Sequence, residues 1–138
     1  MQQTKYAFRI ELNEPYEKAI EDVTGALKEQ GFGVLTTIDV KETLKQRLDK
    51  DFRRYVILGA CNPVLAHQAL ETDLEVGVLL PCNVIVYETS ENSSVVAAMA
   101  PLPTIGMVGA EKLVPVAKEV DQRLRKALES METTMLRK

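Results

Sequence analysis

Hydrophobic and polar positions alternate near the start of the chain, and the pattern then changes to a helical spacing. Every second residue over 6–12 is large and apolar, and this period of two predicts a β-strand with one buried face. Apolar residues recur at helical spacing over 16–27, which predicts an amphipathic helix. Asn13 is the expected N-cap of that helix, and Gly31 is expected to end it in a left-handed conformation.

Two further strands flank a short helix in the next part of the chain. Residues 33–40 contain a run rich in Val, Leu, Ile and Thr that predicts a strand. Asp39 and Glu42 have the spacing of a capping box, so a short helix or turn is expected to begin there. Residues 54–60 contain four consecutive apolar or aromatic side chains, and they predict a strand that can be covered on both faces.

The second half of the chain continues with a helix, a hairpin and a long helix. Asn62 followed by Pro63 is typical of a helix start. The apolar tract 75–88 contains glycine and proline positions, which indicate a bend before or within its strand. A polar turn at 90–93 then leads into a returning strand over 94–100.

The C-terminal part is expected to be mostly helical. Prolines and glycines over 101–109 predict irregular structure. Apolar positions over 113–131 recur close to every 3.6 residues and predict a long helix. Residues 133–138 lack an inward-facing period, so a frayed tail is expected there.

The order of these elements predicts a single α+β domain over residues 1–138. It consists of a largely antiparallel sheet backed by helices, in the order strand, helix, four strands and helix, with short helices inserted. A chain of 138 residues with 46% hydrophobic and 27% charged side chains has the size and composition of one globule with a real core.

Charge and cysteine usage exclude several classes of protein. Seventeen basic and twenty acidic residues leave a net charge of −3, without the positive excess that general nucleic-acid binding requires. The start of the chain has no signal-peptide core, and no stretch approaches the roughly twenty apolar residues of a membrane span. We therefore expect a cytoplasmic protein with no nucleic-acid or membrane partner. In that reducing compartment the two cysteines are expected to be free thiols.

Cys61-Asn62-Pro63 places a thiol where a strand meets a helix N-terminus. The unpaired amides and positive dipole at such a terminus favour a thiolate or bind an anionic ligand. The alternative is a small buried cysteine that ends a strand, with Asn62 as an ordinary cap.

Pro81-Cys82-Asn83 contains a second Cys-Asn pair, at an irregularity of the apolar tract. If the two strands are neighbours, both thiols can face one pocket. The alternative is a core cysteine beside the proline of an edge strand or a bulge. The candidate ligand-binding residues are Cys61, Asn62, Pro63, Pro81, Cys82 and Asn83.

A metal site is a weaker hypothesis. Cys61, Cys82 and His67 would together suit zinc or another borderline-soft metal, but their spacing matches no metal-binding motif. The alternative for His67 is a surface pair with Glu71, one turn along the same helix. No cofactor is expected, because the chain has no GxGxxG, P-loop lysine, HExxH or GxSxG sequence.

The runs ILGACNPVLAHQALETD (57–73) and GVLLPCNVIVYE (77–88) resemble the signature of the family called domain of unknown function 302, DUF302. The resemblance implies a curved antiparallel sheet with packed helices, of the TATA-box-binding-protein-like kind, often as a homodimer. Fold alone does not imply DNA binding. The segment Met99-Ala100-Pro101 departs from the family pattern, in which an acidic residue commonly precedes the proline. The matching motif positions are Cys61, Asn62, Pro63, Leu80, Pro81 and Cys82, without an established reaction.

These observations together favour a homodimeric module that binds a small ligand or a partner near Cys61 and Cys82. An enzyme is less favoured, because the sequence contains no complete catalytic set. The alternatives are a thiol-dependent redox enzyme, a metal-binding protein that uses Cys61, Cys82 and His67, and a structural module in which both cysteines belong to the core.

Overall fold

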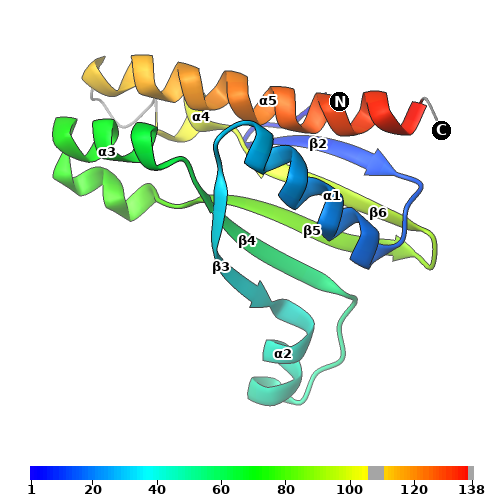
Figure 1. The fold of residues 1–138 in the computed structure, drawn as a ribbon. Helices are drawn as coiled ribbons and strands as arrows, with labels where there is room; N and C mark the ends of the chain where they lie inside the picture. The colour runs from blue at the N-terminus through cyan, green and yellow to red at the C-terminus, as the bar shows by residue number, and fades with distance from the viewer. Residues whose placement is uncertain (106–110, 137–138) are drawn as a thin grey trace.

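A computed structural model of the chain describes residues 1–105 and 111–136, and its centre is one antiparallel β-sheet (Figure 1). The strands are β1 (Gln2–Gln3), β2 (Ala7–Leu12), β3 (Gly33–Asp39), β4 (Tyr55–Cys61), β5 (Cys82–Ser90) and β6 (Ser93–Met99). Their order across the sheet is β1-β2-β6-β5-β4-β3. The hairpin of β5 and β6 therefore lies in the middle, with β2 on one side and β4 on the other.

Helices connect and cover the strands. The α-helices are α1 (Tyr16–Glu29), α2 (Val40–Leu48), α3 (Pro63–Thr72), α4 (Pro101–Thr104) and α5 (Val114–Leu136), with 3₁₀ turns η1 (Leu74–Leu79) and η3 (Glu111–Leu113). Helices α1 and α5 cover the same face of the sheet, whereas α2 projects beyond the end of β3 (Figure 1). No helix in the described ranges is long and apolar enough to cross a bilayer.

The core lies between the sheet and helices α1 and α5. It combines every second residue of the strands with one stripe of each helix, because strand side chains alternate between faces and helix side chains repeat every three to four positions. Fully buried examples are Phe8, Ile10, Val84, Val86, Val23, Leu27, Leu124 and Leu128. The α+β fold expected from the sequence is confirmed; the TATA-box-binding-protein-like comparison stays a prediction.

Several local signals act as the sequence predicts. Gly31 has a φ of +84° just after the end of α1, a conformation that glycine adopts without a Cβ penalty. Asp39 is the N-cap of α2, and its Oδ1 accepts a hydrogen bond from the Glu42 amide at 3.0 Å. The hairpin and the bend before its first strand are also present, since η1 precedes β5 and β5 pairs with β6.

Two expectations about the N-terminal half and the sheet are wrong, and one short strand was not expected. Asn13 does not cap α1: the helix begins directly after Pro15, which occupies the cap position and makes no side-chain cap bond. Strand β4 is not covered on both faces, because α1 and α5 lie on one side and Ile57 on the other side stays partly exposed. The short edge strand β1 has no sequence signal, since two polar residues contain no period.

Two expectations about the C-terminal part also need correction. The stretch after β6 forms the short helix α4, in which the Thr104 hydroxyl donates to the Ala100 carbonyl at 3.0 Å; Gly106 and Gly109 lie outside the described residues. Helix α5 continues to Leu136, past the point where a frayed tail was expected. The amino group of Met1 contacts the Glu132 carboxylate at 2.8 Å and ties down the last turns. Residues 137–138 lie outside the described ranges.

Candidate functional site

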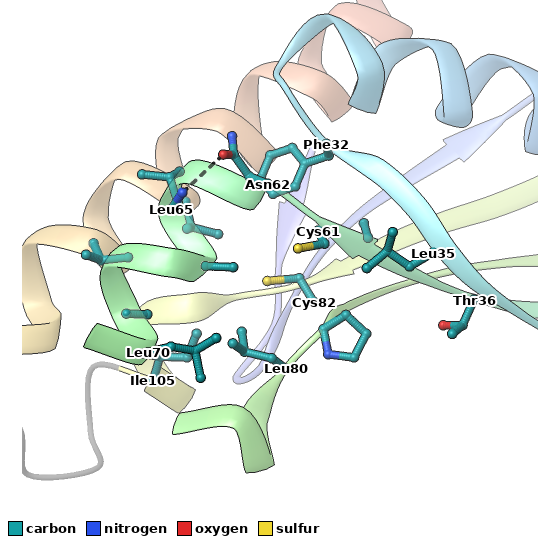
Figure 2. Close-up of a pocket in the computed structure, with 16 residues that line it drawn as sticks. Phe32, Leu35, Thr36, Cys61, Asn62, Leu65, Leu70, Leu80, Cys82 and Ile105 are labelled. Atoms are coloured by element: carbon teal, nitrogen blue, oxygen red, sulfur yellow. Dashed lines mark hydrogen bonds between the residues drawn. The ribbon is translucent and has the colours of Figure 1, made fainter. Parts of the chain in front are cut away.

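A pocket of about 310 Å³ opens where the end of β4 and the start of β5 face helices α3 and α5 (Figure 2). Its volume is at the lower end of the range typical of small-molecule sites. Most of the lining is aliphatic and comes from segments far apart in the sequence, including Leu65, Leu70, Leu80, Ile105, Val116 and Val120. The pocket is therefore a product of tertiary packing between the sheet and two helices.

Both cysteines line this pocket. Ala60 pairs directly with Cys82 across β4 and β5, so Cys61, the last residue of β4, lies at the same end of the sheet. Figure 2 shows both sulfur atoms turned toward the hollow between α3 and the strands. Cys61 is partly exposed, Cys82 is 5% exposed, and both are free thiols. The condition stated for a shared pocket, that the two strands be neighbours, is met.

The environment of Cys82 keeps its thiol protonated. The pKa of Cys82 is raised to about 11, chiefly by burial and to a smaller extent by electrostatic interaction with Cys61. A thiolate in an apolar surrounding loses its hydration without gaining a partner. Cys82 is therefore neutral near pH 7, and a neutral thiol is a weak nucleophile.

Asn62 is the N-cap of α3, and its side chain is engaged within the protein. Its Oδ1 accepts a hydrogen bond from the Leu65 amide at 3.2 Å, and its Nδ2 donates to the Gln30 carbonyl at 3.4 Å. The Ala66 amide donates to the Asn62 carbonyl at 2.8 Å. Two amides at the start of α3 thus already have acceptors, and Asn62 serves both as the N-cap of α3 and as a donor to the Gln30 carbonyl.

Of the other candidate residues, only Pro81 lines the pocket. Pro81 lines the pocket next to Cys82, and its peptide bond with Leu80 is cis. Asn83 is exposed and does not line the pocket, because successive residues of a strand point to opposite faces. Pro63 is also exposed and outside the lining, since it occupies the first turn of α3.

His67 lies on the surface of α3, away from the two thiols in the pocket lining. Its side chain is 74% exposed, and its Nε2 is 3.2 Å from Glu71 Oε1. The surface-pair alternative is therefore confirmed for His67. Within residues 1–105 and 111–136, no group of three His, Cys, Asp or Glu side chains could hold a metal ion. The fold does not bring His67 together with Cys61 and Cys82.

A close contact between strands involves Thr36 and Pro81, two residues of the pocket lining. The pairing of β3 with β4 shifts register between Val34 and Thr36, and Thr36 comes to lie against Gly59. A Cβ at Gly59 would be 2.1 Å from Thr36 Oγ1 and 2.8 Å from Pro81 Cγ. Only glycine fits there without movement of its neighbours, so Gly59 allows β3 and Pro81 to lie close together.

The sequence did not single out Gly59, Thr36 or the aliphatic wall as parts of a site. A glycine inside a strand signals a bulge or a close approach, and that signal was present at Gly59. The apolar residues of α5, such as Val116 and Val120, looked like ordinary core positions. Whether apolar side chains fill a space or leave a gap depends on packing between segments, which a local pattern does not contain.

Comparison with known proteins agrees with the fold and with the family resemblance. The family model for DUF302, a domain of unknown function, matches residues 8–131. The crystal structure of an uncharacterized DUF302 protein from Bacillus stearothermophilus superposes with a TM-score of 0.82 and 30% sequence identity, covering 91% of this chain and 98% of that one. A search of curated proteins found no match. The chain therefore belongs to the DUF302 family.

Proposed function

We propose that the protein is a small-ligand-binding module whose binding site is the pocket beside Cys61 and Cys82. The observation that carries this proposal is the pocket itself, about 310 Å³ in volume and lined by side chains from β3, β4, α3, β5 and α5. A concave apolar pocket with a few polar atoms is the usual form of a small-molecule site. It lies between the two motifs through which the sequence resembles DUF302 proteins.

Binding without chemistry is the better-supported activity. The lining contains no Asp, Glu, His, Lys or Arg among the described residues, so it offers no carboxylate, imidazole, amine or guanidinium for general acid–base catalysis. Burial raises the pKa of the Cys82 thiol to about 11, and a protonated thiol is a poor nucleophile. The Asn62 amide already serves the helix cap and the Gln30 carbonyl.

A screen with matched variants tests the proposal. Unbiased thermal-shift screening of small molecules should find compounds that raise the melting temperature of the protein. Ala66→Phe places a ring into the pocket and should abolish those shifts, because Ala66 lines the pocket. Gln68→Phe adds the same ring to an exposed position of the same helix, outside the lining, and should preserve them. If no compound stabilises the protein, or if Ala66→Phe leaves binding intact, the proposal is wrong.

A thiol pair that cycles between dithiol and disulfide is a second candidate, and one observation favours it. Cys61 and Cys82 belong to adjacent strands and turn their sulfur atoms toward one pocket (Figure 2). Treatment with a mild peroxide would remove two hydrogen atoms and form one intramolecular bond, detected by intact mass and by loss of two titratable thiols. The protonated state of Cys82 opposes this candidate, and two thiols that stay unreactive would exclude it.

We also propose that the module acts as a homodimer in the cytosol. The sheet face opposite α1 and α5 carries Tyr55 and Tyr87 stacked at 5.5 Å, with the partly exposed Ile57 and Ile85 beside them. Helix α2 buries none of its residues, so both surfaces could gain from an apolar partner. Light scattering coupled to size exclusion should give twice the chain mass of 15.4 kDa. A strictly monomeric protein at micromolar concentration would refute this part of the proposal.

A further inference from the structure

We propose that the pocket selects an electrically neutral, apolar molecule of about ten to fourteen non-hydrogen atoms. The inference rests on the proposed binding function and narrows it to one chemical class. It excludes nucleotides, sugar phosphates, fatty-acid anions and amino acids as ligands of this pocket. Its basis is the chemistry of the walls together with the volume that they enclose.

The volume sets the size of the ligand. An apolar protein cavity of about 150 Å³ holds one benzene molecule, which has six non-hydrogen atoms. The pocket here measures about 310 Å³, roughly twice that volume. A bicyclic hydrocarbon or a medium-length alkyl chain therefore fits, whereas a mononucleotide is too large to be enclosed.

The walls offer no opposite charge to an ionic ligand. Among the described residues the polar side chains of the lining are the Thr36 hydroxyl, the Asn62 amide and the two thiols. Asn62 Nδ2 is committed to the Gln30 carbonyl and its Oδ1 to the Leu65 amide. A thiol is only a weak hydrogen-bond donor and acceptor, so it replaces little of the hydration that an ion would lose.

Two groups near the pocket that could attract an anion already make hydrogen bonds within the protein. The amides of Leu65 and Ala66 at the start of α3 donate to Asn62. Arg123 approaches from α5, but its Nη1 donates to the Gln30 carbonyl at 3.1 Å and its Nε to Glu119 at 2.8 Å. An anion in the pocket would give up water without gaining these partners, and that desolvation is costly.

The polarisable side chains of the pocket wall favour an apolar ligand. Sulfur is polarisable and makes favourable contacts with rings and alkyl groups, and Phe32 adds an aromatic surface to the aliphatic wall. Both thiols lie deep enough to contact a ligand, while the rim carries the exposed Leu35.

Pairs of probes that share a carbon skeleton but carry a neutral or an anionic end group test this selectivity. We would measure binding of 1-decanol against decanoate, and of 2-methylnaphthalene against 2-naphthoate, by ligand-observed NMR at neutral pH. The neutral member of each pair should bind at least about tenfold more tightly, because the carboxylate must be desolvated. If the carboxylates bind as tightly as the neutral probes, the inference fails while the proposed binding function stands. If no probe of either kind binds, and the wider screen also finds no ligand, the proposed function itself fails.

A charge placed at the rim provides a second readout. Leu35 lines the pocket and is 68% exposed, so Leu35→Lys should fold normally and supply the missing cation. Because the lysine attracts the carboxylate, we expect this variant to lower the ratio of the decanoate Kd to the decanol Kd by about threefold or more. Thr37→Lys adds the same charge to an exposed position of β3 outside the lining, and it should leave the preference unchanged. If both variants change the Kd ratio equally, or if Leu35→Lys leaves it unchanged, these probes do not bind in this pocket.

Discussion

Cys82 lies directly opposite Ala60 across the pairing of β4 and β5, and the residue after Ala60 is Cys61. The two sequence motifs of this chain therefore meet at one end of the sheet, although the cysteines are 21 positions apart. Helix α3 and the turn η1 occupy the intervening chain, and α3 contributes one wall of the pocket (Figure 2). This relationship brings the cysteines of the two separate Cys-Asn pairs to one pocket.

The stability of the protein should fall at alkaline pH through Cys82. Burial raises the folded-state pKa of Cys82 to about 11 from an ordinary value of 9.0, so between these values the unfolded chain loses this proton while the folded chain keeps it. The contribution of Cys82 to the free energy of unfolding should therefore be fully present below about pH 9, and it should be lost as the pH rises toward 11. Between about pH 8 and pH 10 the expected loss is about 1 kcal/mol, measured by urea unfolding.

The matched control for this effect is Cys82→Ala, which removes the titrating group. The free energy of unfolding of this variant should lack the Cys82 contribution. The difference in unfolding free energy between the two proteins should therefore decrease by about 1 kcal/mol from about pH 8 to about pH 10. If the free energy of unfolding has the same pH dependence in both proteins, the fold does not hold the Cys82 thiol protonated.

Gly59→Ala should destabilise the sheet next to the pocket. The new Cβ would be 2.1 Å from Thr36 Oγ1 and 2.8 Å from Pro81 Cγ, so these neighbours must shift. We expect a loss of about 1–3 kcal/mol in chemical denaturation. Adding Thr36→Ala should recover part of this loss, because it removes the nearer atom. Gly25→Ala is the control, since a Cβ there meets nothing within 4 Å, and it should stabilise α1 by about 0.5–1 kcal/mol.

Asn62→Ala should cost more than an ordinary helix cap. The substitution removes the acceptor for the Leu65 amide and the donor to the Gln30 carbonyl, and these groups lie in a partly buried region. We expect a decrease of about 1–2 kcal/mol in the free energy of unfolding. Asp39→Ala removes the exposed cap of α2, which has no second contact of this kind. A loss at Asn62 no larger than the loss at Asp39 would contradict the dual role of the Asn62 side chain.

Arg125→Ala should destabilise the packing of α5 on β2. Arg125 Nε donates to the buried Asp121 carboxylate at 2.8 Å, and its guanidinium lies 4.3 Å from the centre of the Phe8 ring. Loss of the arginine leaves Asp121 buried without this partner, which should cost about 2–3 kcal/mol. Lys18→Ala breaks a more exposed pair with Asp22, of the same helical spacing, and should change the unfolding midpoint far less. Similar midpoints for both variants would show that the Asp121 pair is not held in a low-dielectric site.

Much of the secondary structure was predictable because its signals are local. The alternation that ends at Leu12, the Asp39 cap and the Asn62-Pro63 helix start each lie within a few residues of the element that they specify. The cap of α1 was misassigned because both Asn13 and Pro15 suit a helix start, and only the backbone shows that the helix begins after Pro15.

The candidate site was predictable only in part. The sequence identified Cys61, Asn62, Pro81 and Cys82, and all four line the pocket. It also included Asn83, whose side chain belongs to the other face of β5 because of the strand's period of two. The aliphatic wall was not predicted, since Val116 is separated from Cys82 by more than thirty positions in the chain.

The sequence by itself determined the family, the α+β class and the residue types available at the two motifs, because periods, caps and turn residues act over short distances along the chain. Only the tertiary structure decided that β4 and β5 are neighbours, that His67 stays on the surface and that the two thiols share one apolar pocket. Strand order and the space left between packed elements depend on long-range contacts, and no local pattern of hydrophobic and polar residues records them.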